Sequence, residues 1–366
     1  MKKLLLIGVS HKTAPVERRE RLSLSEAALP DFLGRISGAP AVAEAVVLST
    51  CNRLEVYVLT ESPSAARELI EKELAARWGE GAPPWYVRED LAAVRHLFHV
   101  AAGLDSLVIG EGEILGQVKR AYEAALGARG TGKFTNVLFQ RALYVGKLVR
   151  AETRISEGAT SSASVAVSLA GKIFGDLTEK NILIVGAGKM AELSARNLLS
   201  QKAARLTVAN RTLDKATELA GPLGGRAVPL EDLPEELLVA DIVICSTGAP
   251  TPLVRAADVR DIMARRRGRA LFFIDIAVPR DVESEVNGIE NVYLYNIDDL
   301  QAIVSETVGR RRSEIEKATL LADRKAEEFC RCCESWQAGR PAPFAHSDFL
   351  SRSSVGGPAA DATFLE

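Results

Sequence analysis

The chain has 366 residues, 47% of them hydrophobic, with a formal net charge of −2 and five cysteines. That length allows about two or three domains with sizeable cores, and the near-neutral charge excludes a global positive field of the kind that binds nucleic acid without specificity. No apolar run approaches the length of a membrane span, and the cysteine spacing does not resemble a disulfide framework, so we expect a cytoplasmic protein.

Residues 1–156 are predicted to form a first α/β domain. Residues 4–9 read as a strand, and Pro15 ends the regular structure that follows it. A helix is expected over 24–36, with Ser23 or Ser25 as its cap. Two β-branched runs around 46–48 and 54–58 flank a polar break, which predicts strand, tight loop and strand. Further helices are expected at 65–78, 91–102, 114–126 and 134–149.

The polar break at 49–53, Ser-Thr-Cys-Asn-Arg, carries reactive and hydrogen-bonding side chains. Cys51 is a potential nucleophile, Arg53 offers a planar fork for a carboxylate or phosphate, and Thr50 and Asn52 add hydrogen-bonding groups. A lone cysteine near a strand end is more often a small buried hydrophobe, and the loop alone favours that interpretation. A functional interpretation depends on what the rest of the chain carries.

A second polar segment, GLDSLVIGEGEILGQ, spans residues 103–117. Its four glycines among acids, a serine and a glutamine suit close approach of a ligand, although glycines often mean only a turn between helices. His96 and His99 stand on the helix just before it. A histidine on an amphipathic helix is usually structural, and whether one of the two moves protons stays open at this point.

Residues 157–300 are predicted to form a Rossmann-type domain. A helix of small residues at 160–174 leads into strands and helices that alternate, which is typical of a parallel sheet covered on both faces. The run from Ile182 through Val185 is a buried-type strand that enters G-x-G-x-x-A and then a helix, the context in which this motif indicates a dinucleotide site. The predicted cofactor-binding residues of this turn are Gly186, Ala187, Gly188, Lys189, Met190 and Ala191.

The next strand of this domain ends in Asn210, Arg211 and Thr212. An NAD site places an acidic residue there, whereas an arginine and a hydroxyl suit the 2′-phosphate of NADP(H), so we predict NADPH as the cofactor. The alternative is a surface arginine at a strand end. Cys245 is expected to pack within the sheet, with the following 246–248 on the nicotinamide side. A cysteine domain joined to such a site suggests a thioester that is reduced by hydride.

Residues 301–336 are predicted to form a long linker or dimerisation helix, because the helical pattern from about 297 is too long for one face of a compact domain. Residues 337–366 are rich in Pro, Gly, Ser and Ala and are expected to be disordered. Cys330, Cys332 and Cys333 could bind metal or haem. No second ligand cluster accompanies them, which favours an incidental cluster and no metal site.

Six segments together resemble glutamyl-tRNA reductase, and they follow one another in order over most of the chain. They are residues 8–20 (GVSHKTAPVERRE), 48–57 (LSTCNRLEVY), 96–119 (HLFHVAAGLDSLVIGEGEILGQVK), 185–190 (VGAGKM), 209–212 (ANRT) and 275–282 (DIAVPRDV). The resemblance implies an NADP-dependent oxidoreductase acting on an acyl group. Such an enzyme reduces glutamate carried on its tRNA with NADPH and releases glutamate-1-semialdehyde, the first step toward 5-aminolevulinate and tetrapyrroles.

The resemblance also implies roles for individual residues. Cys51 matches the nucleophile that forms the thioester, His96 matches the active-site histidine, and Arg53 matches the arginine that holds the side-chain carboxylate of the substrate. His99 stands where other members often have a different residue. The remaining matches to the substrate pocket are Thr50, Asn52, Ser106, Glu111, Gly112, Glu113 and Gln117. Implied partners are charged tRNA(Glu) and, for product transfer, glutamate-1-semialdehyde aminomutase.

The chain departs from the family pattern at several points. Leu54 replaces the usual threonine, and Gly112 with Glu113 replaces the commoner Pro-Gln. Family members continue the long helix into a dimerisation domain, whereas here we expect an abbreviated dimerisation region and leave the homodimer open. Basic groups available for tRNA are Arg141, Lys147, Arg150, Arg154 and the arginines at 310–312.

Two alternatives to a reductase remain at this point. A dehydrogenase of the shikimate type has a similar nucleotide domain, but it would use a lysine–aspartate pair and no cysteine. A truncated homologue could instead act as a non-catalytic regulator that binds tRNA or haem. Cys51, Arg53 and His96 together argue against that regulator.

Overall fold

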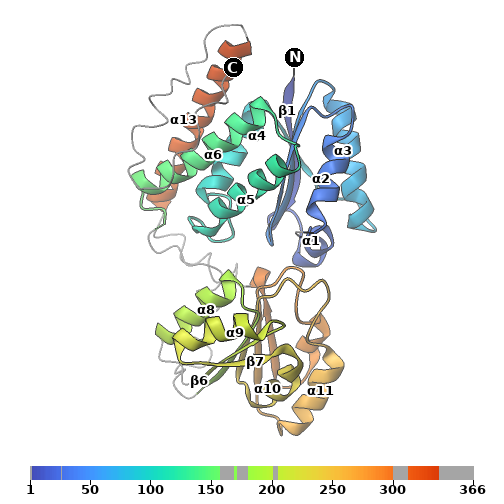
Figure 1. Cartoon of the computed structure of the whole chain (residues 1–366), viewed down its shortest axis with the longest axis vertical. Helices are drawn as coiled ribbons and strands as arrows, with labels where there is room; N and C mark the ends of the chain where they lie inside the picture. The colour runs from blue at the N-terminus through green and yellow to red at the C-terminus, as the bar shows by residue number, and fades with distance from the viewer. Residues whose placement is uncertain are drawn as a thin grey trace.

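The computed structural model describes residues 2–25, 27–156, 169–170, 180–200, 205–299 and 312–337. Two domains lie one above the other in Figure 1, and the last described helix, α13, runs beside the first domain. The helix expected at 160–174 lies almost entirely outside the described residues, as does the expected tail after 337. No helix in the described ranges combines the length and the apolar character needed to cross a membrane.

The first domain is built on a four-stranded antiparallel sheet with the order β2-β3-β1-β4. Its strands are β1 (Lys3–Ser10), β2 (Glu44–Ser49), β3 (Arg53–Thr60) and β4 (Tyr86–Glu89). Ser49 pairs with Leu54, so residues 50–53 make the tight turn between β2 and β3, and the predicted strand, loop and strand are confirmed. All eight residues of β3 are buried, which holds this turn on a rigid base.

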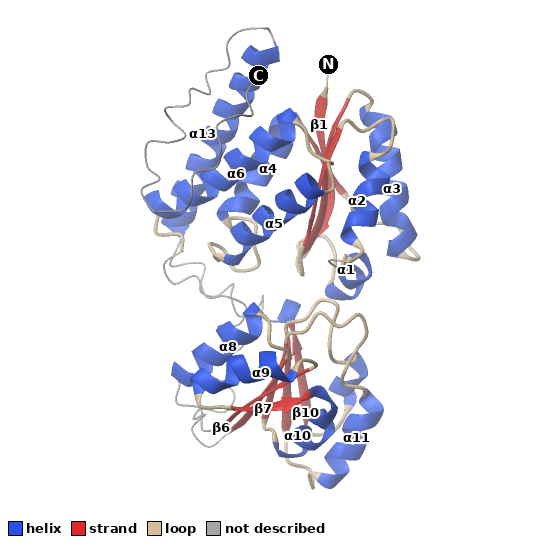
Figure 2. Cartoon of the chain, viewed as in Figure 1, coloured by secondary structure: helices blue, strands red, loops and turns tan. Residues whose placement is uncertain are grey.

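Helices cover both faces of this sheet (Figure 2). One face carries α2 (Leu29–Ser37) and α3 (Pro63–Trp78), and the other carries α4 (Asp90–Ala102), α5 (Glu113–Gly127) and α6 (Lys133–Glu152). The helix expected from residue 24 begins later, at Leu29, and no side chain caps it. A short helix that was not expected, α1 (Val16–Leu22), follows Pro15, because the fixed φ of proline also suits the residue that starts a helix.

The second domain is a six-stranded parallel sheet, as predicted, with the order β10-β9-β8-β5-β6-β7. Its strands are β5 (Asn181–Val185), β6 (Arg205–Asn210), β7 (Arg226–Pro229), β8 (Ile242–Cys245), β9 (Leu271–Asp275) and β10 (Val292–Asn296). The strand order reverses between β5 and β8, and ligands of doubly wound sheets bind in the crevice at that point.

Two separate cores cover the faces of this sheet. One core packs α8 (Lys189–Ser200) and α9 (Leu213–Ala220) on the sheet, and the other packs α10 (Leu233–Val239) and α11 (Ala256–Arg265). Short 3-10 turns lie at η1 (Gly221–Leu223), η2 (Leu230–Asp232) and η3 (Ser284–Gly288). Cys245 is fully buried in β8, as expected for a cysteine that packs within the sheet.

The helix α13 (Arg312–Gln337) returns to the first domain and packs along α4 and α6. Ala318, Ala322, Ala326 and Phe329 are buried in the same core as β1 and α4. His99 Nε2 lies 2.8 Å from Asp323 Oδ1, which links the two helices at their surface. We expected this helix to be too long to cover a face of a compact domain. That expectation is wrong for the described part of the helix, because its alanine-lined face packs closely on α4.

Candidate active site

A cavity of about 310 Å³ is lined by residues of both domains. The first domain contributes Thr50, Cys51, Asn52, Arg53, Ser106, Glu111, Glu113, Ile114 and Gln117. The second contributes Gly188, Lys189, Met190, Ser246, Thr247, Gly248, Ile276, Ala277 and Val278, with Ile297 just after β10. The cysteine loop and the glycine turn, which are far apart in sequence, therefore share one cavity.

Cys51 sits at the tip of the turn between β2 and β3, half-buried against apolar side chains of both domains. It packs against an apolar cluster of Val16, Leu107 and Ile297, and Val278 packs against the same cluster. Burial, reinforced by the carboxylates of Glu111 and Glu113, raises the pKa of the Cys51 thiol to about 12, while Arg19 acts in the opposite direction. The sulfur is therefore a protonated thiol in this arrangement of the domains.

Hydrogen bonds within the turn fix the backbone around Cys51. Thr50 Oγ1 accepts from the backbone N–H groups of Asn52 and Arg53, both at 3.2 Å. The Thr50 N–H in turn donates to the Arg53 carbonyl at 2.9 Å. The Asn52 side chain is buried, and its Oδ1 has no hydrogen-bond partner among the described residues. Asn52 also lines the cavity.

Arg53 is held by carboxylates of its own domain. Its Nη1 lies 2.7 Å from Glu55 Oε1 and 3.0 Å from Asp105 Oδ2. Although burial alone would lower the pKa of Arg53, the charges of Glu55 and Asp105 raise it, so the guanidinium stays charged. The arginine lines the cavity while its orientation is fixed from behind.

His96 lies behind Arg53 and is joined to it through Glu55. Its Nε2 is 2.7 Å from Glu55 Oε1, and the hydroxyl groups of Tyr57 and Tyr86 each lie 2.6 Å from an oxygen of the same carboxylate. Burial would raise the pKa of Glu55, but the neighbouring charges of His96 and Arg53 hold it well below its usual range. His96 is not among the described residues that line the cavity.

Glu55 and Tyr57 were missed by sequence reasoning, although β3 carries a signal for them. Arg53, Glu55 and Tyr57 alternate along the strand, so their side chains leave the same face of the sheet. A glutamate on a strand with no other charged residue after Arg53 is a candidate partner for that arginine. The third partner, Tyr86 on β4, could be found only from the strand order.

The segment from Gly103 to Glu113 is fixed by a side chain of α6. Arg150 Nη2 donates to the Glu111 carbonyl at 2.8 Å, and Nη1 lies 3.4 Å from the Gly112 carbonyl. Burial, with a contribution from Glu113, raises the pKa of Glu111 to about 7. Gly112 precedes α5 and is not among the described residues that line the cavity, whereas Glu111 and Glu113 on either side of it are.

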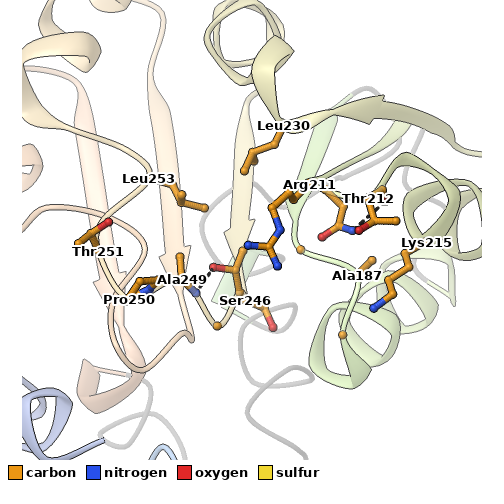
Figure 3. Close-up of a pocket in the computed structure, with 15 residues that line it drawn as sticks. Ala187, Arg211, Thr212, Lys215, Leu230, Ser246, Ala249, Pro250, Thr251 and Leu253 are labelled. Atoms are coloured by element: carbon orange, nitrogen blue, oxygen red, sulfur yellow. Dashed lines mark hydrogen bonds between the residues drawn. The ribbon is translucent and has the colours of Figure 1, made fainter. Parts of the chain in front are cut away.

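A second pocket, of about 450 Å³, lies at the crevice of the parallel sheet (Figure 3). It is lined by Gly186, Ala187, Gly188, Asn210, Arg211, Thr212, Lys215, Leu230, Leu253 and residues 246–251. Gly186 has a φ of +108°, and a Cβ there would lie 2.6 Å from the Ser246 carbonyl oxygen, so only glycine fits this turn. Of the predicted cofactor residues, Lys189 and Met190 line the interdomain cavity instead, and Ala191 is buried where α8 packs on the sheet.

Lys215 is a pocket residue that the sequence reasoning did not single out. It stands in the first turn of α9, three residues after Thr212, and lies on the same side of the pocket as Arg211 (Figure 3). Both side chains are exposed. Among the described residues no group of three or more His, Cys, Asp or Glu side chains could hold a metal ion.

Comparisons with known proteins agree with this architecture. A family model described as "Glutamyl-tRNAGlu reductase, N-terminal domain" matches residues 7–153, and one described as "Shikimate / quinate 5-dehydrogenase" matches residues 168–303. The chain is 42% identical to the glutamyl-tRNA reductase of Nitratidesulfovibrio vulgaris (strain DSM 19637 / Miyazaki F), over 91% of this chain and 76% of that protein. It is 44% identical to the enzyme of that name from Desulfovibrio desulfuricans, over 90% of this chain and 76% of that protein.

A solved structure agrees as well. The glutamyl-tRNA reductase from Methanopyrus kandleri is 38% identical, with a TM-score of 0.50 over 91% of this chain and 81% of that chain. The chain therefore belongs to the glutamyl-tRNA reductase family, as an oxidoreductase whose second domain has the nucleotide-binding fold of the shikimate dehydrogenases.

Proposed function

We propose that this protein reduces glutamyl-tRNA(Glu) to glutamate-1-semialdehyde with NADPH, through a thioester on Cys51. Membership of the family assigns the chain to tetrapyrrole biosynthesis, and the proposed reaction is the entry step toward 5-aminolevulinate. The observation that supports the proposal most directly is the interdomain cavity, in which Cys51 and the glycine turn line the same space. A sulfur that carries an acyl group there is within reach of a nicotinamide held by the second domain.

The first half of the reaction is acyl transfer to Cys51. The thiolate sulfur attacks the ester carbon of the glutamyl group, a C–S bond forms, the C–O bond to the terminal ribose breaks, and the ribose oxygen takes a proton. A thioester is a better hydride acceptor than the ester it replaces. Bound NADPH would supply a hydride to the acyl carbon, and the C–S bond would then break, which releases the aldehyde and leaves Cys51 as a thiolate.

Polar side chains around Cys51 suit the two charges of a glutamyl group. We assign the side-chain carboxylate of the glutamyl group to Arg53, because this cation lines the cavity beside Cys51. The ammonium group fits the carboxylates of Glu111 and Glu113 and the free Oδ1 of Asn52. Ser106, Thr50 and Gln117 complete the polar wall.

His96 takes a positioning role in this proposal. It lies behind Arg53, and its hydrogen bond to Glu55 orients the carboxylate that in turn orients the guanidinium. A direct part in proton transfer, which the sequence left open, would need a water molecule or a movement of Arg53 to connect His96 with the ester. We therefore assign His96 to the alignment of Arg53.

NADPH rather than NADH fits the second pocket. Gly186 and Gly188 bring the backbone and the start of α8 to the pyrophosphate, as in other turns of this kind. Arg211 and Lys215 supply two cations where an NAD site would place a carboxylate, and Thr212 adds a hydroxyl. The 2′-phosphate of NADPH would pair with both cations.

The proposed partners are charged tRNA(Glu) and the protein that receives the aldehyde. Arg141 and Lys147 lie on α6, whereas Arg150 already donates to the Glu111 carbonyl and Arg310 and Arg311 lie outside the described residues. Phosphate contacts from α6 would make tRNA binding depend on salt. Transfer of the aldehyde to glutamate-1-semialdehyde aminomutase and assembly as a homodimer follow from the family resemblance alone.

The proposal is tested with glutamyl-tRNA that carries a radiolabelled glutamyl group. Without NADPH we expect label on the unaltered protein and slow hydrolysis, and with NADPH we expect labelled aldehyde. The Cys51→Ser protein should take no thioester label and form no aldehyde, while Cys332→Ser, a cysteine on α13, should behave as the unaltered protein. Aldehyde formation by Cys51→Ser would refute the proposal, and an unaltered protein that never takes label would favour a non-catalytic regulator.

A further inference from the structure

Arg19 of α1 is a buried cation beside Cys51, and the chemistry above gives it no part. Val16, three residues earlier on the same helix, belongs to the apolar cluster against which Cys51 packs. Residues three apart on a helix lie on one face, with about 5–6 Å between their Cβ atoms. Arg19 therefore leaves α1 on the side that meets the cysteine, where its side chain is 3% exposed.

An aspartate just after β10 fixes this turn of α1. Arg19 Nη2 lies 2.6 Å from Asp298 Oδ1, and Oδ2 of the same carboxylate accepts from the Val16 N–H at 2.9 Å. Ile297, the residue before Asp298, belongs to the cluster around Cys51 and lines the cavity. The guanidinium is therefore held at a defined place next to the cysteine.

The guanidinium of Arg19 is only partly used by this ion pair. Its Nε and Nη1 atoms are buried and have no hydrogen-bond partner among the described residues. A buried donor without a partner costs free energy, which an apolar side chain of similar size would avoid. This position therefore favours a use for the positive charge in addition to the pair with Asp298.

Arg53, two residues after Cys51, is directed to other partners. Its Nη1 lies 2.7 Å from a Glu55 oxygen and 3.0 Å from an Asp105 oxygen, so two carboxylates balance its charge. The arginine that is close to the cysteine in sequence is therefore occupied by anions of its own domain. Arg19, on a different element, has a single carboxylate within ion-pair distance in the described part of the chain.

The electrostatics of the cysteine agree with this geometry. Burial raises the pKa of the Cys51 thiol, the carboxylates of Glu111 and Glu113 reinforce that rise, and the charge of Arg19 opposes it. The effect is mutual: burial lowers the pKa of Arg19, whereas the charges of Asp298 and of an ionised Cys51 raise it. The guanidinium thus attracts the sulfur when the sulfur is an anion.

Other titratable groups around Arg19 leave its charge available. The Glu17 side chain is 52% exposed, so water screens it, and Glu20 is already paired with Arg280, with Oε1 and Nη2 2.9 Å apart. Burial, with nearby cations in support, lowers the pKa of His11 to about 4, so this imidazole is neutral near pH 7.

We infer that Arg19 is the electrostatic partner of the Cys51 sulfur and stabilises it as an anion at the two points of the reaction where it carries charge. These points are the attack on the glutamyl ester and the release of the aldehyde. The inference rests on the proposed function. In the attack, the proton that the sulfur loses balances the proton that the ribose oxygen gains, and after release the thiolate takes a proton from water. Arg19 keeps its own proton throughout.

Alkylation of Cys51 in the protein without tRNA tests the charge beside the sulfur, with mass spectrometry of the Cys51 peptide as the readout. Iodoacetamide is neutral and iodoacetate is an anion, so the ratio of the iodoacetate rate to the iodoacetamide rate reports the local potential. A change in access alters both rates together. In Arg19→Gln we expect the iodoacetamide rate at about pH 8 to fall roughly three- to tenfold, and the ratio to fall several-fold.

Two variants serve as controls for Arg19→Gln. Arg19→Lys keeps the positive charge and should retain most of the rate and of the ratio. Arg18→Gln removes a charge from the same helix, but Arg18 lies over the Trp78 ring and its Nη1 lies 3.4 Å from the Trp78 carbonyl oxygen. Both quantities should therefore stay unchanged in Arg18→Gln.

A further variant changes the charge from the other side and serves if Arg19→Gln fails to fold. Asp298→Asn keeps the shape but leaves Arg19 without its counter-charge, so the ratio of iodoacetate to iodoacetamide alkylation should rise several-fold. The protein that carries both Asp298→Asn and Arg19→Gln has lost both charges, and the rise should disappear. A ratio that Asp298→Asn leaves unchanged would contradict the inference.

A turnover measurement separates this inference from the proposed function. With labelled glutamyl-tRNA, acyl-enzyme should form more slowly in Arg19→Gln by a similar factor, with little change in KM, because Arg19 is not among the described residues that line the cavity. If the ratio of alkylation rates in Arg19→Gln equals that of the unaltered protein, or if both reagents simply become faster, Arg19 only holds α1 in place and the inference is overturned, while the function of Cys51 stands. If the unaltered protein forms no acyl-enzyme, the proposed function fails whatever the alkylation rates are.

Discussion

His96 and Arg53 bind the same oxygen of Glu55: Nε2 of the histidine and Nη1 of the arginine each lie 2.7 Å from Oε1. The Glu55 side chain is 0% exposed and the Arg53 side chain 1%, so this carboxylate is the internal counter-ion of an arginine that lines the cavity. A buried charge of this kind is stable only while its partners are present.

Replacing Glu55 tests that dependence. Glu55→Gln keeps the shape but removes the charge, and Arg53 is left with Asp105 as its remaining carboxylate. We expect the free energy of unfolding to fall by about 3–5 kcal/mol, as measured by urea denaturation. The same change at Glu73, whose pair with Arg35 is partly exposed, should cost less than about 1 kcal/mol. Equal losses at the two positions would contradict the described burial of Glu55.

The packing of α13 on the first domain gives a second prediction. Phe329 is 1% exposed and meets the rings of Phe98 and Phe134, so Phe329→Ala should lower the free energy of unfolding by about 3–5 kcal/mol. Leu320, on the same helix, is 65% exposed, and Leu320→Ala should change stability by less than about 0.5 kcal/mol. Chemical denaturation of both variants measures the difference, and a tolerant Phe329 would mean that α13 does not belong to this core.

Cofactor choice gives a third prediction. Arg211→Ala and Lys215→Ala should each raise the KM for NADPH by roughly 10- to 100-fold, because each removes a charged partner of the 2′-phosphate. The KM for NADH should stay almost unchanged, since NADH lacks that phosphate. Arg205→Ala, an exposed arginine at the opposite end of β6, is the matched control. Equal effects on the two cofactors would remove the basis for choosing NADPH.

The pH dependence of Cys51 reactivity gives a fourth prediction. Burial, reinforced by Glu111 and Glu113, raises the pKa of Cys51 to about 12, so only a small fraction is thiolate at neutral pH. Its alkylation rate should therefore keep rising up to about pH 10, whereas an ordinary thiol levels off near about pH 9. Stability changes in the opposite direction from the alkylation rate. As the pH rises past the ordinary thiol pKa of about 8.5, the Cys51 thiol of the unfolded chain ionises before that of the folded chain, so the free energy of unfolding falls.

Peptide mapping after a timed pulse of iodoacetamide measures the Cys51 rate separately from the other cysteines. Glu113→Gln removes one of the two nearby carboxylates and should shift the profile to lower pH. A profile for the unaltered protein that levels off near about pH 9 would show that the sulfur is not covered as described.

Local sequence patterns predicted the strands and turns whose conformation depends on neighbouring residues. The β-branched runs on either side of Ser49–Arg53 predicted the hairpin that carries Cys51, and the strand before Gly186 predicted the dinucleotide turn, where a φ of +108° explains the glycine. The resemblance to the family then gave roles to residues of the cysteine loop and the 103–117 segment, and Cys51, Arg53, Ser106, Glu111, Glu113 and Gln117 among them line one cavity.

The relationships that sequence reasoning missed are the long-range ones. Whether His96 faces the cavity or Glu55 depends on how α4 packs on the sheet, where it contacts β1 and β4, and no local pattern encodes that packing. The contact between Glu20 and Arg280 joins positions 260 residues apart. The alanines at 318, 322 and 326 did form a stripe at helical spacing, and reading it as a contact face would have placed α13 against another helix.

The return of α13 to the first domain makes that domain discontinuous in sequence. Its core combines residues from Leu4 to Ile155 with Ala318 to Cys333, and the entire nucleotide domain is encoded between them. On the ribosome, the apolar side of α4 that Phe329 covers must therefore stay open until the nucleotide domain has been translated. A nascent chain stalled before residue 318 would expose Phe98 and Phe134, and chaperones that recognise aromatic surface would find their target there.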